Sequence, residues 1–199
     1  NALLAAPDCT TVAGLRDRAM LHLTYAAGLR VSELLALQMG DFSDRSLSTV
    51  RVLGKGRRER VLPLWKETQT VLRTWIAVRP SVQVQELFVN REGRPLSRDG
   101  FAHRLAVHVA AAARKKPTLA EKRVTPHVLR HSCAMHTLEA TGDIRKVSLW
   151  LGHASLQSTE ASLRVDPAEK LAILAANAAP AVPKGRFRTP DRLLAMLAE

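Results

Sequence analysis

Several basic side chains stand in settings where they could bind a phosphate. Arg30 lies in YAAGLRVSELLAL between two helical patterns, and the start of the second helix is a favourable place for an anion. In PHVLRHSCAMH, His127 and Arg130 are three residues apart and therefore share a helical face. Arginine offers planar donors to phosphate oxygens, and histidine can pass a proton near neutral pH. These residue types favour chemistry on a phosphate ester.

Two further residues could join this group. Lys55 lies in the Gly-Lys-Gly turn of VLGKGRRERVLPL, where its flexible stem could reach a neighbouring groove, although the frame of a P-loop is absent. His153 follows Leu151-Gly152, where glycine allows the chain to turn after a helix. Taken singly, each of the two is equally compatible with a structural or surface role.

A zinc site is the alternative use of the same histidines. His127 and His131 have the spacing of H-E-x-x-H, but Val128 replaces the glutamate that would act as base. The two cysteines, Cys9 and Cys133, are far apart and form no C-x-x-C pair, so neither a cysteine-rich metal site nor a disulfide framework is expected. We expect Cys133 to belong to the core and the protein to need no metal or other cofactor.

The elements that position these residues are mostly helices. The apolar period predicts helices over 11–27, 31–37, 65–78, 97–115, 126–140, 143–151, 155–164 and 167–178. Residues 48–53 and 60–64 alternate with a period of two around GKGRRE, which predicts a basic β-hairpin. LFVNREGRPL suggests a short strand and turn. The expected fold class is mainly α with a small antiparallel sheet (α+β).

Charge and hydropathy indicate which kind of partner the protein binds. The 199 residues carry 30 Lys and Arg against 18 Asp and Glu, a net charge of +12, and the basic residues cluster. Such clusters attract nucleic acid, because each neutralised phosphate releases condensed counterions. No apolar run is long enough for a membrane span, and no signal peptide is visible. The expected DNA contacts are Arg51, Arg57, Arg58, Lys115, Lys116, Lys122 and Arg123.

Together the motifs resemble the catalytic domain of the tyrosine recombinases, the phage-integrase and Xer-like family. AAGLRVSELLAL resembles its first arginine motif, VLGKGRRERVLPL its hairpin lysine motif, TPHVLRHSCAMHTLEATGD its His-x-x-Arg box and LWLGHASLQSTEASLRV its Leu-Gly-His box. The resemblance covers about residues 11–170. It implies the fold of that catalytic domain and transesterification of DNA phosphodiesters, without necessarily any metal. It also implies that Arg30 and Arg130 hold the non-bridging oxygens, that Lys55 protonates the leaving 5′ oxygen, and that His127 and His153 assist.

The nucleophile departs from the family pattern. The family places a tyrosine nine residues after the Leu-Gly-His histidine, but here that position is Ser162, and the single tyrosine, Tyr25, is expected in the core. A serine hydroxyl is shorter and harder to ionise than a phenol, and no base is apparent beside it. We therefore interpret Ser162 as an inactivating replacement, engineered rather than natural.

The resemblance also implies a domain organisation. Residues 1–178 would form the catalytic domain, and 179–199 a Pro-rich, basic tail and short helix that docks on a neighbouring protomer; the N-terminal DNA-gripping domain of the family has no counterpart here. The expected partners are double-stranded DNA and other recombinase protomers, in the cytoplasm of a bacterial, phage or mobile-element host. Two alternatives stay open: a non-cutting DNA-binding or regulatory module, and a relaxing enzyme similar to type IB topoisomerases.

Overall fold

The computed structural model describes residues 2–42, 46–54 and 59–152. The chain divides into two compact units, Asn1–Arg164 and Val165–Glu199, and every described residue belongs to the first. The helices expected over 155–164 and 167–178 and the tail 179–199 lie outside the described residues. The expected domain boundary after residue 178 stays a prediction.

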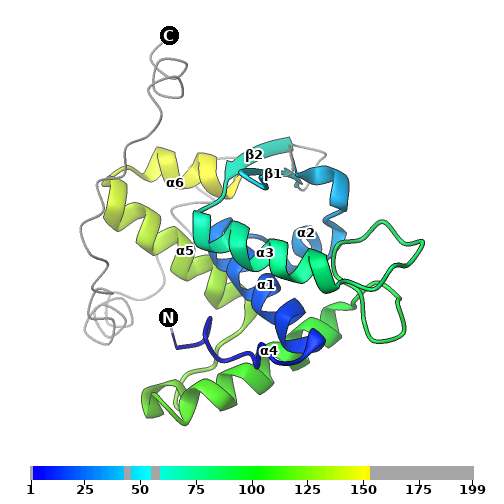
Figure 1. Cartoon of the computed structure of the whole chain (residues 1–199). Coiled ribbons are helices and arrows are strands. Elements are labelled where there is room, and N and C mark those ends of the chain that lie inside the picture. The colour runs from blue at the N-terminus through cyan, green and yellow to red at the C-terminus, as the bar shows by residue number, and fades with distance from the viewer. Residues whose placement is uncertain (1, 43–45, 55–58, 153–199) are drawn as a thin grey trace. The chain divides into compact units, whose positions relative to one another are not determined.

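Helix α1 (Val12–Ala26) is the centre of the described unit. The Thr11 side chain caps its start by accepting a hydrogen bond from the Gly14 amide. α1 packs against α3 (Lys66–Val78), which crosses it in Figure 1, and against α5 (Pro126–Thr141). Because both sides of α1 are covered, Ala19 and Leu23 are fully buried.

The predicted hairpin forms beside this core. Strands β1 (Thr49–Leu53) and β2 (Glu59–Pro63) pair antiparallel, with Arg51 opposite Val61. Val52 and Leu62 point into the core, while Leu53 and Val61 are exposed, as the alternation predicted. α2 (Val31–Ala36) and the short 3₁₀ turn η1 (Met39–Asp41) lead from α1 to the hairpin.

The segment over residues 87–96 is a turn with one isolated bridge, Val89 to Pro95, and not the short strand that the sequence suggested. Arg79 explains part of this. Its guanidinium binds the carbonyl oxygens of Val84, Glu86 and Leu87, which are therefore occupied by a side chain. Trp75 also donates to the Leu87 carbonyl and stacks on Phe88, which fixes the turn to α3.

The remaining helices begin and end at residues with clear capping roles. α4 (Arg98–Ala113) and α5 are capped by Ser97 and Thr125, and α6 (Ile144–Leu151) by Asp143. α5 and α6 end at Gly142 and Gly152, both left-handed. A 3₁₀ turn, η3 (Pro117–Leu119), follows α4.

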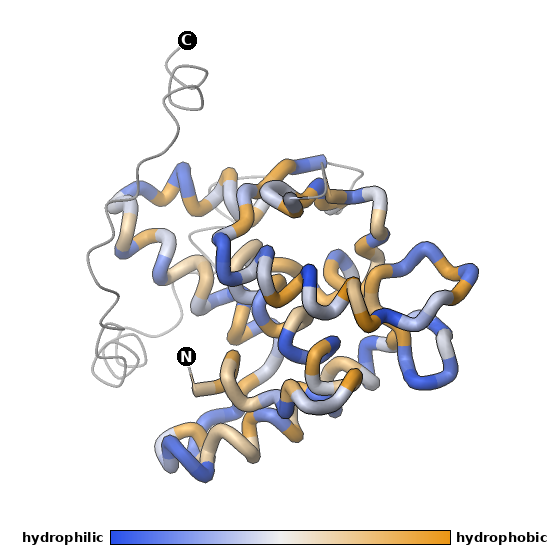
Figure 2. The backbone as a smooth tube through the Cα atoms, in the orientation of Figure 1, coloured by the Kyte–Doolittle hydropathy of each residue, from blue (hydrophilic) through white to orange (hydrophobic). Residues whose placement is uncertain are grey.

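The predicted class, mainly α with a small antiparallel sheet, is confirmed. Apolar and polar residues alternate along the helices in Figure 2, as amphipathic packing requires. Within the described ranges, no helix is both long and apolar enough to span a bilayer.

Candidate functional site

A buried carboxylate, Glu33, organises the first arginine motif. Its Oε1 accepts hydrogen bonds from Nη1 of Arg30 (2.8 Å) and Nη1 of Arg60 (3.2 Å). Its Oε2 accepts from the Arg30 backbone amide (2.9 Å) and from Nη2 of Arg60 (2.8 Å). Sequence reasoning missed Glu33. The available signal was its place three residues after Arg30 at the start of α2, where a glutamate reaches back to the helix cap.

Arg130 comes to the same carboxylate from α5. Its Nη1 lies 3.7 Å from Oε2 of Glu33 and donates to the Gly28 carbonyl, while Nη2 donates to the Leu151 carbonyl at 2.8 Å. These two carbonyls belong to the ends of α1 and α6. The structure therefore brings Arg30 and Arg130, 100 residues apart in sequence, to the same carboxylate.

Gly28 is required for this approach. It has φ +57°, and a Cβ there would lie 2.5 Å from Cδ2 of Leu151 and 3.1 Å from Sγ of Cys133. A side chain would therefore push against the Leu151 side chain and the Cys133 thiol, besides straining the backbone. The buried Cys133 packs in the core as expected. Burial raises its pKa to about 11, which leaves the thiol neutral.

The ionisation of the cluster follows from burial and from pairing. Burial alone would raise the pKa of the Glu33 carboxyl, but hydrogen bonds from Arg60 and Arg30 outweigh it and hold that pKa below its ordinary value. Burial, followed by repulsion from Arg30, lowers the pKa of Arg130 to about 10. At neutral pH one carboxylate thus faces three guanidinium groups.

This excess of positive charge makes the cluster receptive to an anion. The Arg30 side chain is 37% exposed, whereas those of Arg60 and Arg130 are 9% and 7% exposed. Arg30 is therefore the member that meets solvent, backed by two buried charges. Arginines arranged in this way suit the planar, multidentate recognition of phosphate oxygens.

His127 lies next to the cluster on the first turn of α5. It is exposed, and together with Arg130, His131, Ala134 and Leu151 it lines a small, open surface depression. The expected sharing of one face by His127 and Arg130 is thus seen. His127 therefore lies beside Arg130 and is open to solvent.

Several expected site residues fall outside the described residues: Lys55, Arg57, Arg58, His153 and Ser162. The residues directly before positions 55 and 153 are nevertheless described. Gly54 follows β1 directly before position 55, and Gly152 ends α6 directly before position 153. The hairpin and α6 both reach the arginine cluster, through Arg60 of β2 and through the Leu151 carbonyl.

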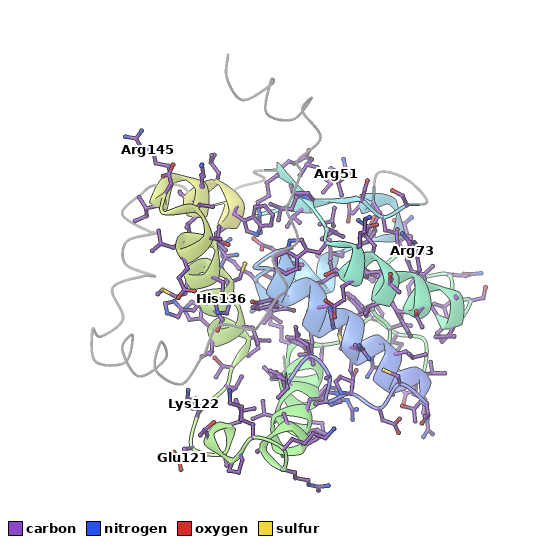
Figure 3. The ribbon with its side chains drawn as sticks, turned by 60° about the vertical axis from the view of Figure 1, so that its left-hand side comes forward. Arg51, Arg73, Glu121, Lys122, His136 and Arg145 are labelled. Carbon is purple, nitrogen blue, oxygen red and sulfur yellow. The ribbon has the colours of Figure 1, made fainter. Side chains whose placement is uncertain are left out.

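The expected DNA contacts do not form one continuous patch. Arg51 is exposed on β1, 3.4 Å from a carboxylate oxygen of Asp41. Lys122 lies at the far end of the described unit from Arg51 in Figure 3, beyond α4. Lys115, Lys116 and Arg123 are exposed in the segment around η3. Among the expected contacts that the structure describes, Arg51 therefore lies apart from the group formed by Lys115, Lys116, Lys122 and Arg123.

Two other polar groups lie away from the cluster. The Tyr25 hydroxyl is 2.7 Å from Nδ1 of His136, and the ring is half-buried 6.1 Å from Trp65, so the core position expected for Tyr25 is met only in part. Among the described residues, no group of three or more His, Cys, Asp or Glu side chains is placed to hold a metal ion.

Comparison with known proteins agrees with this geometry. The model of the phage integrase family matches residues 1–169. A Sinorhizobium fredii protein described as an integrase or recombinase, y4rC, is 41% identical over 197 residues, which cover 99% of this chain and 59% of that protein. Tyrosine recombinase XerD of Listeria innocua is 40% identical over 164 residues, covering 79% of this chain and 53% of XerD.

Solved structures show the same fold. The crystal structure of XerA recombinase superposes with a TM-score of 0.71 at 26% identity, over 87% of this chain and 61% of that one. The chain thus spans between about a half and three fifths of the length of these relatives. With the family match, the similar sequences and the similar fold, the chain belongs to the phage integrase family, with the fold of a tyrosine recombinase catalytic domain.

Proposed function

We propose that this chain is the catalytic part of a site-specific DNA recombinase or integrase whose nucleophile position is occupied by Ser162. The observation that carries the proposal is the cluster of Arg30, Arg60 and Arg130 around Glu33, open to solvent at Arg30 and bordered by His127. Structures similar in fold include XerH recombinase bound to its difH substrate before and after cleavage. We infer that double-stranded DNA is the substrate here too.

The proposed reaction is transesterification at a DNA phosphodiester. Attack on phosphorus adds negative charge to the non-bridging oxygens, and Arg30 and Arg130 would stabilise that charge most in the transition state. Lys55 would protonate the departing 5′ oxygen, and His127 and His153 would donate hydrogen bonds and assist proton transfer. In a form with tyrosine at position 162, the strand would be held as a 3′-phosphotyrosyl intermediate and rejoined to a partner strand.

Other recombinase protomers are the proposed partners on DNA, with the tail 179–199 docking on a neighbour. The proposed location is the cytoplasm of a bacterial host, where chromosomal and mobile-element DNA is accessible. Arg51 and the basic residues around Lys122 would contact backbone phosphates at two separate places along the duplex.

Residue 162 provides the test. The serine form should give no covalent protein–DNA adduct, and Ser162→Tyr should give one, because a phenol supplies both reach and an easier ionisation. The complete gene product is incubated with a nicked duplex that carries a site selected by binding from a random-sequence pool. Adducts are separated on a denaturing gel.

Ser162→Phe is the matched control, since it restores the ring without the hydroxyl. An adduct with the serine or phenylalanine form would contradict the assigned nucleophile position. Binding of the selected site without any adduct in the tyrosine form would favour the alternative of a non-cutting DNA-binding module.

A further inference from the structure

Arg60 is the buried charge that none of the phosphate-binding roles above explains. It lies on β2 at an inward position, between the exposed Glu59 and Val61, and its side chain is only 9% exposed. An arginine at an inward strand position costs desolvation energy and needs strong compensation. The compensation is a two-point hydrogen bond to both carboxylate oxygens of Glu33.

Arg60 also contacts the end of α6. A Cβ added to Gly152 would lie 2.9 Å from Cδ and 3.0 Å from Nη1 of Arg60, so the arginine occupies the space that a side chain at 152 would need. Its buried Nε has no hydrogen-bond partner within the described part of the chain. The side chain thus fills the contact between the hairpin, α2 and α6.

The oxygen that Arg60 binds also lies close to Arg130. Nη2 of Arg60 holds Oε2 of Glu33, and that same oxygen is 3.7 Å from Nη1 of Arg130. Without Arg60, Oε2 could accept a direct hydrogen bond from Arg130. Arg130 would then be drawn away from the Gly28 and Leu151 carbonyls that now orient it.

We propose that Arg60 is a positioning residue of the strand-transfer site: its fork holds Glu33 in the orientation that keeps the Arg30 and Arg130 guanidiniums apart and directed at one phosphate. This inference rests on the proposed function. Arg60 itself binds Glu33 and fills the space beside Gly152, and the proposal gives it no direct contact with the phosphate.

Three variants distinguish the effect of the Arg60 charge from its effect on the position of Glu33. Arg60→Lys keeps the charge but loses the fork, because an ammonium is a point donor. Arg60→Met removes one charge, so one carboxylate then faces two guanidiniums. Arg60→Met with Glu33→Gln removes one charge of each sign, which keeps the net charge of the cluster but removes the tether. Arg73→Met, an exposed arginine on α3 labelled in Figure 3, controls for the loss of a distant charge.

The first measurement is single-turnover cleavage by the complete gene product in the Ser162→Tyr background, with DNA binding measured in parallel. Arg60→Lys and the double variant should cleave at least about tenfold more slowly, with binding changed less than about twofold, because the transition state needs the geometry more than the ground state does. A wild-type cleavage rate in Arg60→Lys, or recovery in the double variant, would overturn the proposal.

A second substrate locates the defect. A 5′-bridging phosphorothiolate leaves as a thiolate, which needs no proton from the enzyme. A defect acting on the phosphate-binding arginines should persist with this substrate, and disappearance of the Arg60→Lys defect would refute that assignment.

The third measurement does not depend on activity. In the 199-residue chain with Ser162, the Nε–Hε NMR signals of Arg30 and Arg130 should shift in Arg60→Lys and stay unchanged in Arg73→Met. Unchanged Arg30 and Arg130 signals in Arg60→Lys would overturn the positioning role. Absence of cleavage by the tyrosine form with Arg60 intact would instead count against the proposed function.

Discussion

At the scale of single residues, the site depends on one glycine as much as on its charged groups. Gly28 provides the carbonyl that Arg130 binds, and its left-handed backbone lets Leu151 and Cys133 close over it. The orientation of Arg130 and the packing of α5 and α6 against α1 therefore both depend on the backbone at Gly28.

Gly28→Ala should destabilise the protein by at least about 2 kcal/mol, the sum of a left-handed alanine and a steric clash. Gly142→Ala is the matched control, because Gly142 has φ +65° but nothing within 4 Å of an added Cβ. Urea unfolding of both variants gives the comparison. Equal losses of unfolding free energy would show that the Leu151 and Cys133 contacts do not restrict position 28.

At the scale of the elements, a second buried carboxylate joins α1 to α4. Asp17 is 1% exposed and accepts hydrogen bonds from Arg16 (2.7 Å), Arg104 (2.5 Å) and His108 (2.8 Å). Arg16 also donates to the Val89 carbonyl, which attaches the turn before α4. Burial alone would raise the pKa of Asp17, but hydrogen bonding to His108 and the charge of Arg16 outweigh it and lower that pKa.

Asp17→Asn should cost roughly 3–5 kcal/mol of unfolding free energy at neutral pH, because it leaves buried cations uncompensated. Since the folded pKa of Asp17 is lowered, this contribution is fully present above the ordinary aspartate pKa of about 4 and is lost as pH falls through the folded value. The difference between wild type and Asp17→Asn should therefore be constant near neutrality and shrink in acid.

Chemical denaturation across this pH range is the measurement. Glu92→Gln, at the exposed pair with Arg94, is the control and should change stability by less than about 1 kcal/mol at every pH. A difference for Asp17→Asn that grows as pH falls would contradict the assigned ionisation.

The elements themselves were largely predictable from local patterns. The helices at α1, α3, α4, α5 and α6 and both strands follow from apolar periods and capping residues, which act over a few neighbours. Over residues 87–96 the turn was predicted but the short strand does not form, and side chains of Trp75 and Arg79 take up the Leu87 carbonyl.

The site was predictable only where a motif marks it. Arg30, His127 and Arg130 were found from their motifs, whereas Glu33 and Arg60 were not. Glu33 carried one local signal, its place three residues after Arg30 at the start of α2. Its pairing with Arg60 joins α2 to the hairpin, and no local pattern encodes that contact.

At the scale of the whole molecule, the basic charge concerns DNA more than folding. The net charge is +12, and Arg51 lies far from Lys122 and its basic neighbours. A duplex contacting both places would release counterions at several phosphates. Affinity for a duplex should therefore fall steeply and linearly in a log–log plot against salt concentration.

Fluorescence anisotropy with a random-sequence duplex measures this salt dependence. Replacing Lys115, Lys116 and Lys122 together by Gln should reduce the slope by up to about three, because each lost phosphate contact removes roughly one released counterion. Arg73→Gln, which removes an exposed charge on α3, is the control and should leave the slope nearly unchanged. An unchanged slope in the lysine variant would exclude that group from the DNA contact.

The single tyrosine gives the chain an unusual optical property. Tyr25 lies 6.1 Å from Trp65, so its excitation energy passes to the indole, and its hydroxyl is bound to His136. Burial, then the neighbouring Cys133 and Glu139, raises the pKa of this phenol above its ordinary value. The 199-residue chain should therefore show almost no phenolate absorbance until the pH is strongly alkaline.

In Ser162→Tyr, any phenolate that appears below the ordinary phenol pKa of about 10 belongs to residue 162. The amount by which the pKa of the phenol at position 162 is lowered then measures how strongly nearby cations would stabilise the attacking oxygen. This measurement needs neither DNA nor turnover.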